Sequence, residues 1–144
     1  MKMVLVEEEA LTCADDTVFR SPDDLERLRP LLTEFASKVP EGMHALLLDA
    51  AGHPLGLVRS SATARRRSVR WIQEVLRVAL TTEVPTASIV PVRTTKGTPP
   101  RASVADAVLS GRLAGAAEAM QMHMPGLILA GSEAVVFHDF EKEG

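Results

Sequence analysis

The chain has 144 residues, of which 46% are hydrophobic, and a formal net charge of −3 at pH 7. This length and composition predict one folded domain rather than a disordered chain. The negative net charge gives no overall attraction to nucleic acid, and four Phe, one Trp and no Tyr argue against an aromatic platform for single strands. The one cysteine, Cys13, excludes an internal disulfide and has no basic neighbour to make its thiol reactive.

No apolar run reaches the roughly 18 residues of a membrane span. The N-terminus passes from Met1 directly into an acidic stretch and lacks the apolar segment of a secretion signal. We therefore expect a cytoplasmic protein without membrane contact, and the sequence leaves oligomerisation open.

The first half of the chain predicts a strand, a helix and a hairpin. Residues 3–6 are typical of a short edge strand, and Ser21 followed by Pro22 and two acids favours a helix start. Leucines at helical spacing continue that helix, which Pro30 should kink or split. The uniformly apolar residues 45–48 predict a strand buried on both faces, with residues 55–58 as its hairpin partner.

The second half predicts two helices and three strands. Residues 68–80 form an amphipathic helix, residues 86–92 a central strand, residues 103–122 a long helix, and residues 127–130 with 134–137 a final hairpin. The expected inner face of the first helix consists of Val69, Ile72, Val75, Leu76 and Ala79. For the long helix we expect an inner face of small residues, namely Val104, Ala107, Val108, Gly111, Ala114 and Gly115.

This order of elements predicts an α/β domain of three layers around a mixed sheet. The whole chain, residues 1–144, is expected to form the domain. Residues 1–20 are an N-terminal strand and loop, and residues 138–144 are a polar tail.

Several short stretches carry a resemblance to a known family. Seven residues separate Glu41 from Asp49, a helix contains Gln73-Glu74-Val75-Leu76, and a helix opens at Ser103-Val104-Ala105-Asp106. In order and spacing, residues 21–137 resemble the RadC-like branch of the JAB/MPN (JAMM) metalloproteases. The resemblance implies a cytidine-deaminase-like three-layer fold and a family linked to DNA repair and bacterial DNA metabolism.

The resemblance also implies a site that has lost its metal. Glu41 stands in the place of the catalytic acid/base, and Asp106 in that of the third zinc ligand after Ser103. Arg93 and Thr95 stand where the family has two histidines, so a positive guanidinium replaces a neutral ligand. Zinc lowers the pKa of its bound water to about 7, so the loss should abolish hydrolysis. We expect a pseudoenzyme without zinc or isopeptidase activity, serving as a binding or scaffold module for a protein or nucleic acid.

Alternatives remain at the same residues. Ser103 and Asp106 fit a capping box. A basic loop beside a helix N-terminus can bind phosphate or a nucleic-acid backbone, together with the helix at residues 65–77. The candidate anion-binding residues are Arg93, Lys96, Arg101, Arg65, Arg66, Arg67 and Arg70. A third alternative is a residual metal-dependent hydrolase using Glu41 and Asp106.

Overall fold

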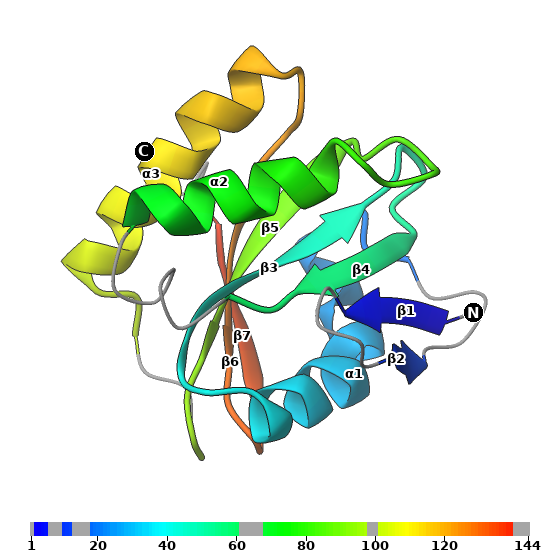
Figure 1. Ribbon diagram of the computed structural model, residues 1–144. Coiled ribbons are helices and arrows are strands. Elements are labelled where there is room, and N and C mark those ends of the chain that lie inside the picture. Colours follow the sequence, from blue (N-terminus) through cyan, green and yellow to red (C-terminus); the bar gives the residue numbers. More distant parts are fainter. Residues whose placement is uncertain (1, 6–9, 13–17, 61–67, 98–100, 140–144) are drawn as a thin grey trace.

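The computed structural model describes residues 2–5, 10–12, 18–60, 68–97 and 101–139 (Figure 1). Within these ranges the chain forms a seven-stranded sheet and three α-helices. In chain order, the elements are β1 (Lys2–Leu5), β2 (Ala10–Thr12), a 3₁₀ turn (Pro22–Asp24), α1 (Leu25–Lys38), β3 (Gly42–Leu48), β4 (Pro54–Val58), α2 (Ser68–Ala79), β5 (Ser88–Thr94), α3 (Val104–Ala119), β6 (Gly126–Ala130) and β7 (Val135–Asp139).

The sheet is mixed, as predicted, and its strand order is β2-β1-β4-β3-β5-β6-β7. β3 lies near the centre and pairs antiparallel with both β4 and β5. β5 and β6 are parallel, with α3 as the connection between them, and β1 is parallel to β4. The α/β class expected from the sequence is therefore confirmed.

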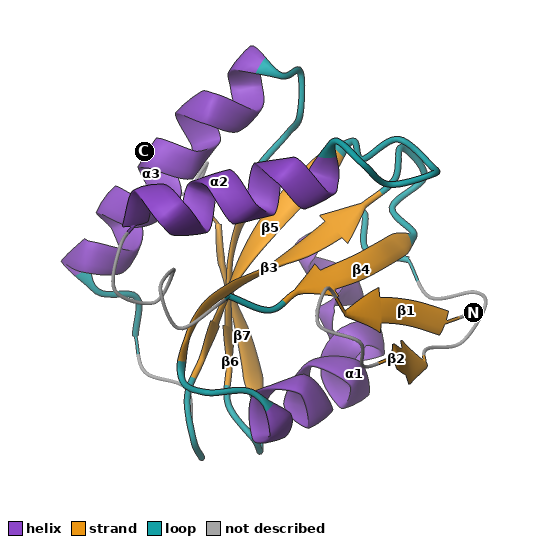
Figure 2. Ribbon diagram, in the orientation of Figure 1, coloured by secondary structure: helices purple, strands orange, loops and turns teal. Residues whose placement is uncertain are grey.

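Helices cover both faces of the sheet, which gives three layers (Figure 2). Successive residues of β3 alternate between two cores: Leu46 and Leu48 pack with α1, while Ala45 and Leu47 pack with α2 and α3. Residues 43–48 are all buried, as expected for a central strand with both faces covered. The expected hairpin of β3 and β4 is present.

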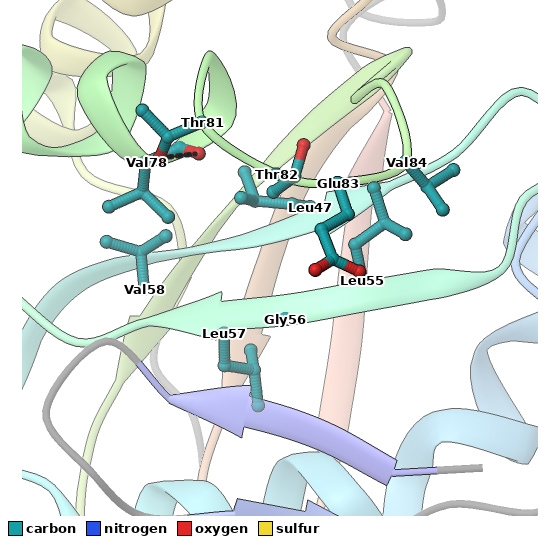
Figure 3. Close-up of a pocket in the computed structure, with 10 residues that line it drawn as sticks. All are labelled: Leu47, Leu55, Gly56, Leu57, Val58, Val78, Thr81, Thr82, Glu83 and Val84. Carbon is teal, nitrogen blue, oxygen red and sulfur yellow. Dashed lines mark hydrogen bonds between the residues drawn. The ribbon is translucent and has the colours of Figure 1, made fainter.

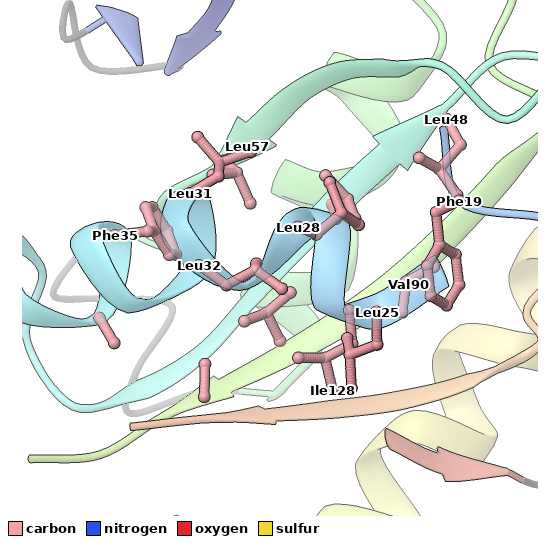
Figure 4. Packing of buried hydrophobic residues seen from close by; sticks show 14 of the residues in the cluster. Phe19, Leu25, Leu28, Leu31, Leu32, Phe35, Leu48, Leu57, Val90 and Ile128 are labelled. Atoms are coloured by element: carbon pink, nitrogen blue, oxygen red, sulfur yellow. The ribbon is translucent and has the colours of Figure 1, made fainter. Parts of the chain in front are cut away.

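The larger aliphatic core lies between α1 and the sheet (Figure 4). α1 contributes residues that recur every three or four positions, and they face strands from β3 to β6. The helical members are Leu25, Leu28, Leu31, Leu32, Phe35 and Ala36. The packing of this face holds α1 on the sheet up to its C-terminal residue, Lys38, which lies shortly before Glu41 in the chain.

One prediction about the N-terminal half was wrong, and one of two alternatives at Pro30 is excluded. β1 is not an edge strand, because β2, which the sequence analysis missed, pairs with its outer side. α1 is not split at Pro30 and runs continuously from Leu25 to Lys38. Pro30 is exposed, so water can reach the carbonyl group that lost its intrahelical donor.

The helix α3 buries a different face from the predicted one. Its buried residues are Asp106, Ser110, Leu113 and Ala117. Val104 and Val108 are 83% and 52% exposed, and a Cβ added at Gly111 or Gly115 would have no neighbour within 4 Å. Apolar residues lie all around this helix, so periodicity did not identify its inner face.

The helix α2 was predicted in its extent, but one face residue was wrong. Val69 is 61% exposed, whereas Trp71 is 1% exposed and lies in the core with Val75 and Ala79. The spacing of Val69 and Ile72 predicted a buried face that begins at residue 69. The buried face instead begins at Trp71.

The final hairpin forms as predicted, with β6 and β7 antiparallel. The expected polar tail starts too early, because β7 extends through His138 to Asp139; residues 140–144 lie outside the described part of the chain. No helix among the described residues is long and apolar enough to cross a membrane.

Candidate functional site

Three of the predicted site residues lie at one end of the sheet. In the β3–β5 pairing Met43 lies opposite Arg93 and Gly42 opposite Thr94. Residues directly opposite each other in a sheet point to the same face, and this face reverses at every residue. Met43 belongs to the core under α2 and α3, so Arg93 faces α3. Glu41 directly precedes β3 and Thr95 directly follows β5, so both residues lie at this end of the sheet.

The N-terminus of α3 supplies the fourth residue. Ser103 caps the helix: its hydroxyl group accepts a hydrogen bond of 3.0 Å from the Asp106 amide, and Asp106 Oδ2 accepts one of 3.0 Å from the Ser103 amide. This is the capping box that the spacing allowed. It also fixes the Asp106 side chain against the first turn of α3.

Asp106 forms an ion pair with Arg93 across the β5–α3 interface. A guanidinium nitrogen of Arg93 donates to Asp106 Oδ1, so both carboxylate oxygens are engaged. The Asp106 side chain is 4% exposed and that of Arg93 34%. Arg93, which the sequence analysis assigned to a basic loop, therefore lies in β5 and pairs with Asp106 inside the protein.

Glu41 holds the loop that follows β5. Its Oε2 accepts a hydrogen bond of 2.7 Å from the backbone amide of Lys96. The next amide, that of Gly97, donates to the Ser132 hydroxyl group at 2.9 Å, and the Thr95 amide donates to Ala130 at 2.9 Å. Three successive amides of this loop are thus bound, and the Glu41 carboxylate serves as an acceptor for backbone rather than facing a free cleft.

The candidate anion-binding side chains are mostly directed elsewhere. Lys96 Nζ donates to the carbonyl group of Val39 at 3.5 Å, at the end of α1. Arg70 pairs with Glu74 along α2 at 3.4 Å, and Arg101 is exposed. Arg65, Arg66 and Arg67 lie outside the described residues.

Two polar atoms at the site are buried without a partner among the described residues. They are Arg93 Nε and Thr95 Oγ1. Buried polar atoms normally have a hydrogen-bond partner, which can be an ordered water. The neighbouring Thr94 hydroxyl group is different, because it donates to the carbonyl group of Pro40 at 3.1 Å.

A histidine that the sequence analysis did not single out stabilises the start of β3. His44 is fully buried, and its Nδ1 accepts a hydrogen bond of 2.9 Å from the Ser60 amide. The proton of the neutral ring is then on Nε2, which lies 3.0 Å from the carbonyl oxygen of Pro40. The His44 ring also packs edge-on against Phe35. His44 thereby fixes Pro40, the residue before Glu41. The only sign of this role in the sequence is that His44 is the one polar residue in an otherwise apolar stretch, residues 43–48.

These residues do not fit the zinc that the resemblance implies. Such a site needs three protein ligands, and imidazoles are the preferred neutral ones. Here the first two positions hold a cation and a hydroxyl group, and Asp106 already accepts hydrogen bonds through both oxygens. No group of three or more His, Cys, Asp or Glu residues suited to a metal occurs within the described ranges.

The remaining histidines lie away from these positions. His44 faces α1, where it meets Phe35. His53 lies in the β3–β4 turn, with Nδ1 3.4 Å from Asp49 Oδ2. His123 follows α3, and its backbone amide bonds to Ala87.

No protein-family model matches the sequence, and no curated protein matches it significantly.

Proposed function

We propose that this chain is a metal-free binding or scaffold module with a JAB/MPN-like fold, in which an ion pair stands where that family holds zinc. The observation that carries the proposal is the contact between the Arg93 guanidinium and the buried Asp106 carboxylate. In this proposal the guanidinium group of Arg93, a residue of β5, takes the place of a bound zinc ion beside Asp106.

The arrangement of the surrounding residues supports this proposal. Glu41, Arg93, Thr95 and Asp106 come from three separate elements and gather at one end of the sheet. In the resemblance that the sequence suggests, these residues stand in the places of the family's Glu, His, His and Asp. Each of the two carboxylates is now a hydrogen-bond acceptor for the protein itself, Glu41 for a loop amide and Asp106 for Arg93 and a helix cap. Chemically, such a site holds β5, its loop and α3 together.

Restoring the histidines tests the proposal. The double variant Arg93→His/Thr95→His places two imidazoles beside Asp106, which completes a three-ligand set. We expect the purified wild-type protein to hold zinc well below one equivalent, and the double variant to bind about one equivalent by calorimetry and metal analysis. Adding Asp106→Asn should weaken that binding, since it removes the anionic ligand.

A matched control is Lys96→His/Arg101→His, which adds two histidines near the site but outside the family positions. Zinc binding by the first double variant that is no tighter than that of this control would contradict the proposed arrangement. Stoichiometric zinc in the wild-type protein, or its cleavage of an isopeptide substrate, would favour the hydrolase alternative instead.

Nucleic-acid binding is the weaker alternative, because Arg93, Lys96 and Arg70 all have partners within the protein. A salt titration with duplex DNA tests it. Binding that weakens steeply with salt, and that is lost when Arg93, Lys96 and Arg101 become Ala, would support it.

A further inference from the structure

An open pocket of about 640 Å³ lies between β4 and the loop that follows α2. It is on the same face of the sheet as α2. The pocket volume lies within the range of about 300–1,000 Å³ that is usual for small-molecule sites. The residues that line it are Leu47, Leu55, Gly56, Leu57, Val58, Val78, Thr81, Thr82, Glu83 and Val84 (Figure 3).

The floor of the pocket is formed where a side chain is missing. Gly56 lies opposite Leu47 in the β3–β4 pairing, so a side chain at position 56 would point toward the α2 side. A glycine inside a strand weakens the strand and often marks the close approach of a ligand or of another backbone. Among the described glycines, positive φ occurs at Gly42, Gly52 and Gly97 and not at Gly56. Backbone conformation therefore does not require a glycine here, although the β-bulge beside it contributes to the local shape.

The pocket has apolar walls and one ionised group among its described residues. Two lining hydroxyl groups are engaged locally: Thr81 donates to Val78 at 3.1 Å, and Thr82 lies 3.0 Å from the Thr86 hydroxyl group. The Glu83 carboxylate has no hydrogen bond or ion pair to any described residue, and Figure 3 shows it turned from the loop toward β4, beside Leu55. The rim includes Val84, a valine that is 49% exposed.

We propose that this pocket binds a small organic cation, an aliphatic body carrying a protonated amine. The aliphatic part would contact Leu55 and Val58 above Gly56, and the ammonium group would pair with Glu83. Charge complementarity selects this class, because the described lining has a carboxylate and no Lys or Arg. A fatty acid of the same length would place its anion against Glu83. None of the residues that line this pocket belongs to the Arg93–Asp106 site, so the two proposals are independent.

The experiment compares octylamine, octanol and octanoate on the full-length protein, with binding followed by amide chemical shifts. We expect octylamine to shift the amides of Gly56, Val58 and Val84 and to bind about two- to fivefold more tightly than octanol, the range of an exposed ion pair. Octanoate should bind most weakly. Glu83→Gln should reduce the affinity for octylamine to that for octanol, and Glu83→Lys should reverse the order of amine and carboxylate.

Glu83 is exposed, so both variants should fold, and circular dichroism checks this. Glu118→Gln, an exposed carboxylate on α3, is the matched control and should change none of the affinities. Equal binding of the three probes, or an order unchanged in Glu83→Lys, would overturn the proposal. So would probe-induced shifts located outside the pocket. Shifts of the same amides with protein concentration alone would mean that a second copy of the chain covers the pocket, which also overturns it.

Discussion

The backbone amide of Lys96 donates a hydrogen bond of 2.7 Å to the Glu41 carboxylate, which joins the loop after β5 to the start of β3. Glu41 thus accepts from the backbone on one side of the site, while Asp106 accepts from Arg93 on the other. Both carboxylates therefore hold structural elements together.

Removing the Glu41 carboxylate should release the Lys96 amide. In Glu41→Ala this amide should exchange with solvent faster, because its acceptor is lost, and stability should fall by about 0.5–1.5 kcal/mol. Glu41→Gln keeps a side-chain oxygen and should largely preserve protection. Hydrogen exchange read by NMR measures both, and the Gly97 amide, which donates to Ser132, is an internal control. Equal protection of Lys96 in Glu41→Ala and in the wild type would contradict the assignment.

The Arg93–Asp106 pair should show strong coupling. Arg93→Met leaves a buried carboxylate without its charged partner and should cost about 1–3 kcal/mol. Adding Asp106→Asn removes the unpaired charge while keeping an oxygen for the cap, so the double variant should recover part of the loss. Urea unfolding of the four proteins gives the coupling energy, expected at about 0.5–3 kcal/mol. Simple additivity of the two changes would show that the contact contributes nothing.

Substitutions on the two sides of α3 test which face is buried. Leu113 is fully buried, so Leu113→Ala should lower the free energy of unfolding by about 2–5 kcal/mol. Val104→Ala and Val108→Ala alter exposed side chains and should change it by less than about 0.5 kcal/mol. A large loss at Val104 or Val108 would instead support the face that periodicity suggested.

Two glycines form a matched pair with opposite expectations. A Cβ at Gly126 would lie 2.4 Å from the His138 carbonyl oxygen and 2.5 Å from the Phe137 ring, so Gly126→Ala should destabilise the β6–β7 hairpin by about 1–3 kcal/mol. At Gly115 in α3, a Cβ meets nothing within 4 Å, and Gly115→Ala should stabilise by up to about 1 kcal/mol. Thermal unfolding distinguishes the two. Equal effects would contradict the close approach at Gly126.

The sequence alone predicted the α/β class and most of the elements, because strong local signals marked them. The apolar run of β3 and the spaced leucines of α1 are patterns within a single segment of the chain. Such patterns can be recognised without knowing which other segments the residues contact. The capping box was readable for the same reason, since Ser103 and Asp106 are three residues apart and interact within one helical turn.

The tertiary structure decided what local patterns leave open. The pairing of β1 with β2 depends on two weak strands meeting, and the inner face of α3 was set by a contact with Arg93 thirteen residues earlier in the chain. The roles of Glu41 and His44 likewise depend on partners at Lys96 and Ser60. The residue types at the site were visible in the sequence. Their hydrogen-bond partners were not, because sheet register and helix rotation bring distant side chains together only in the folded chain.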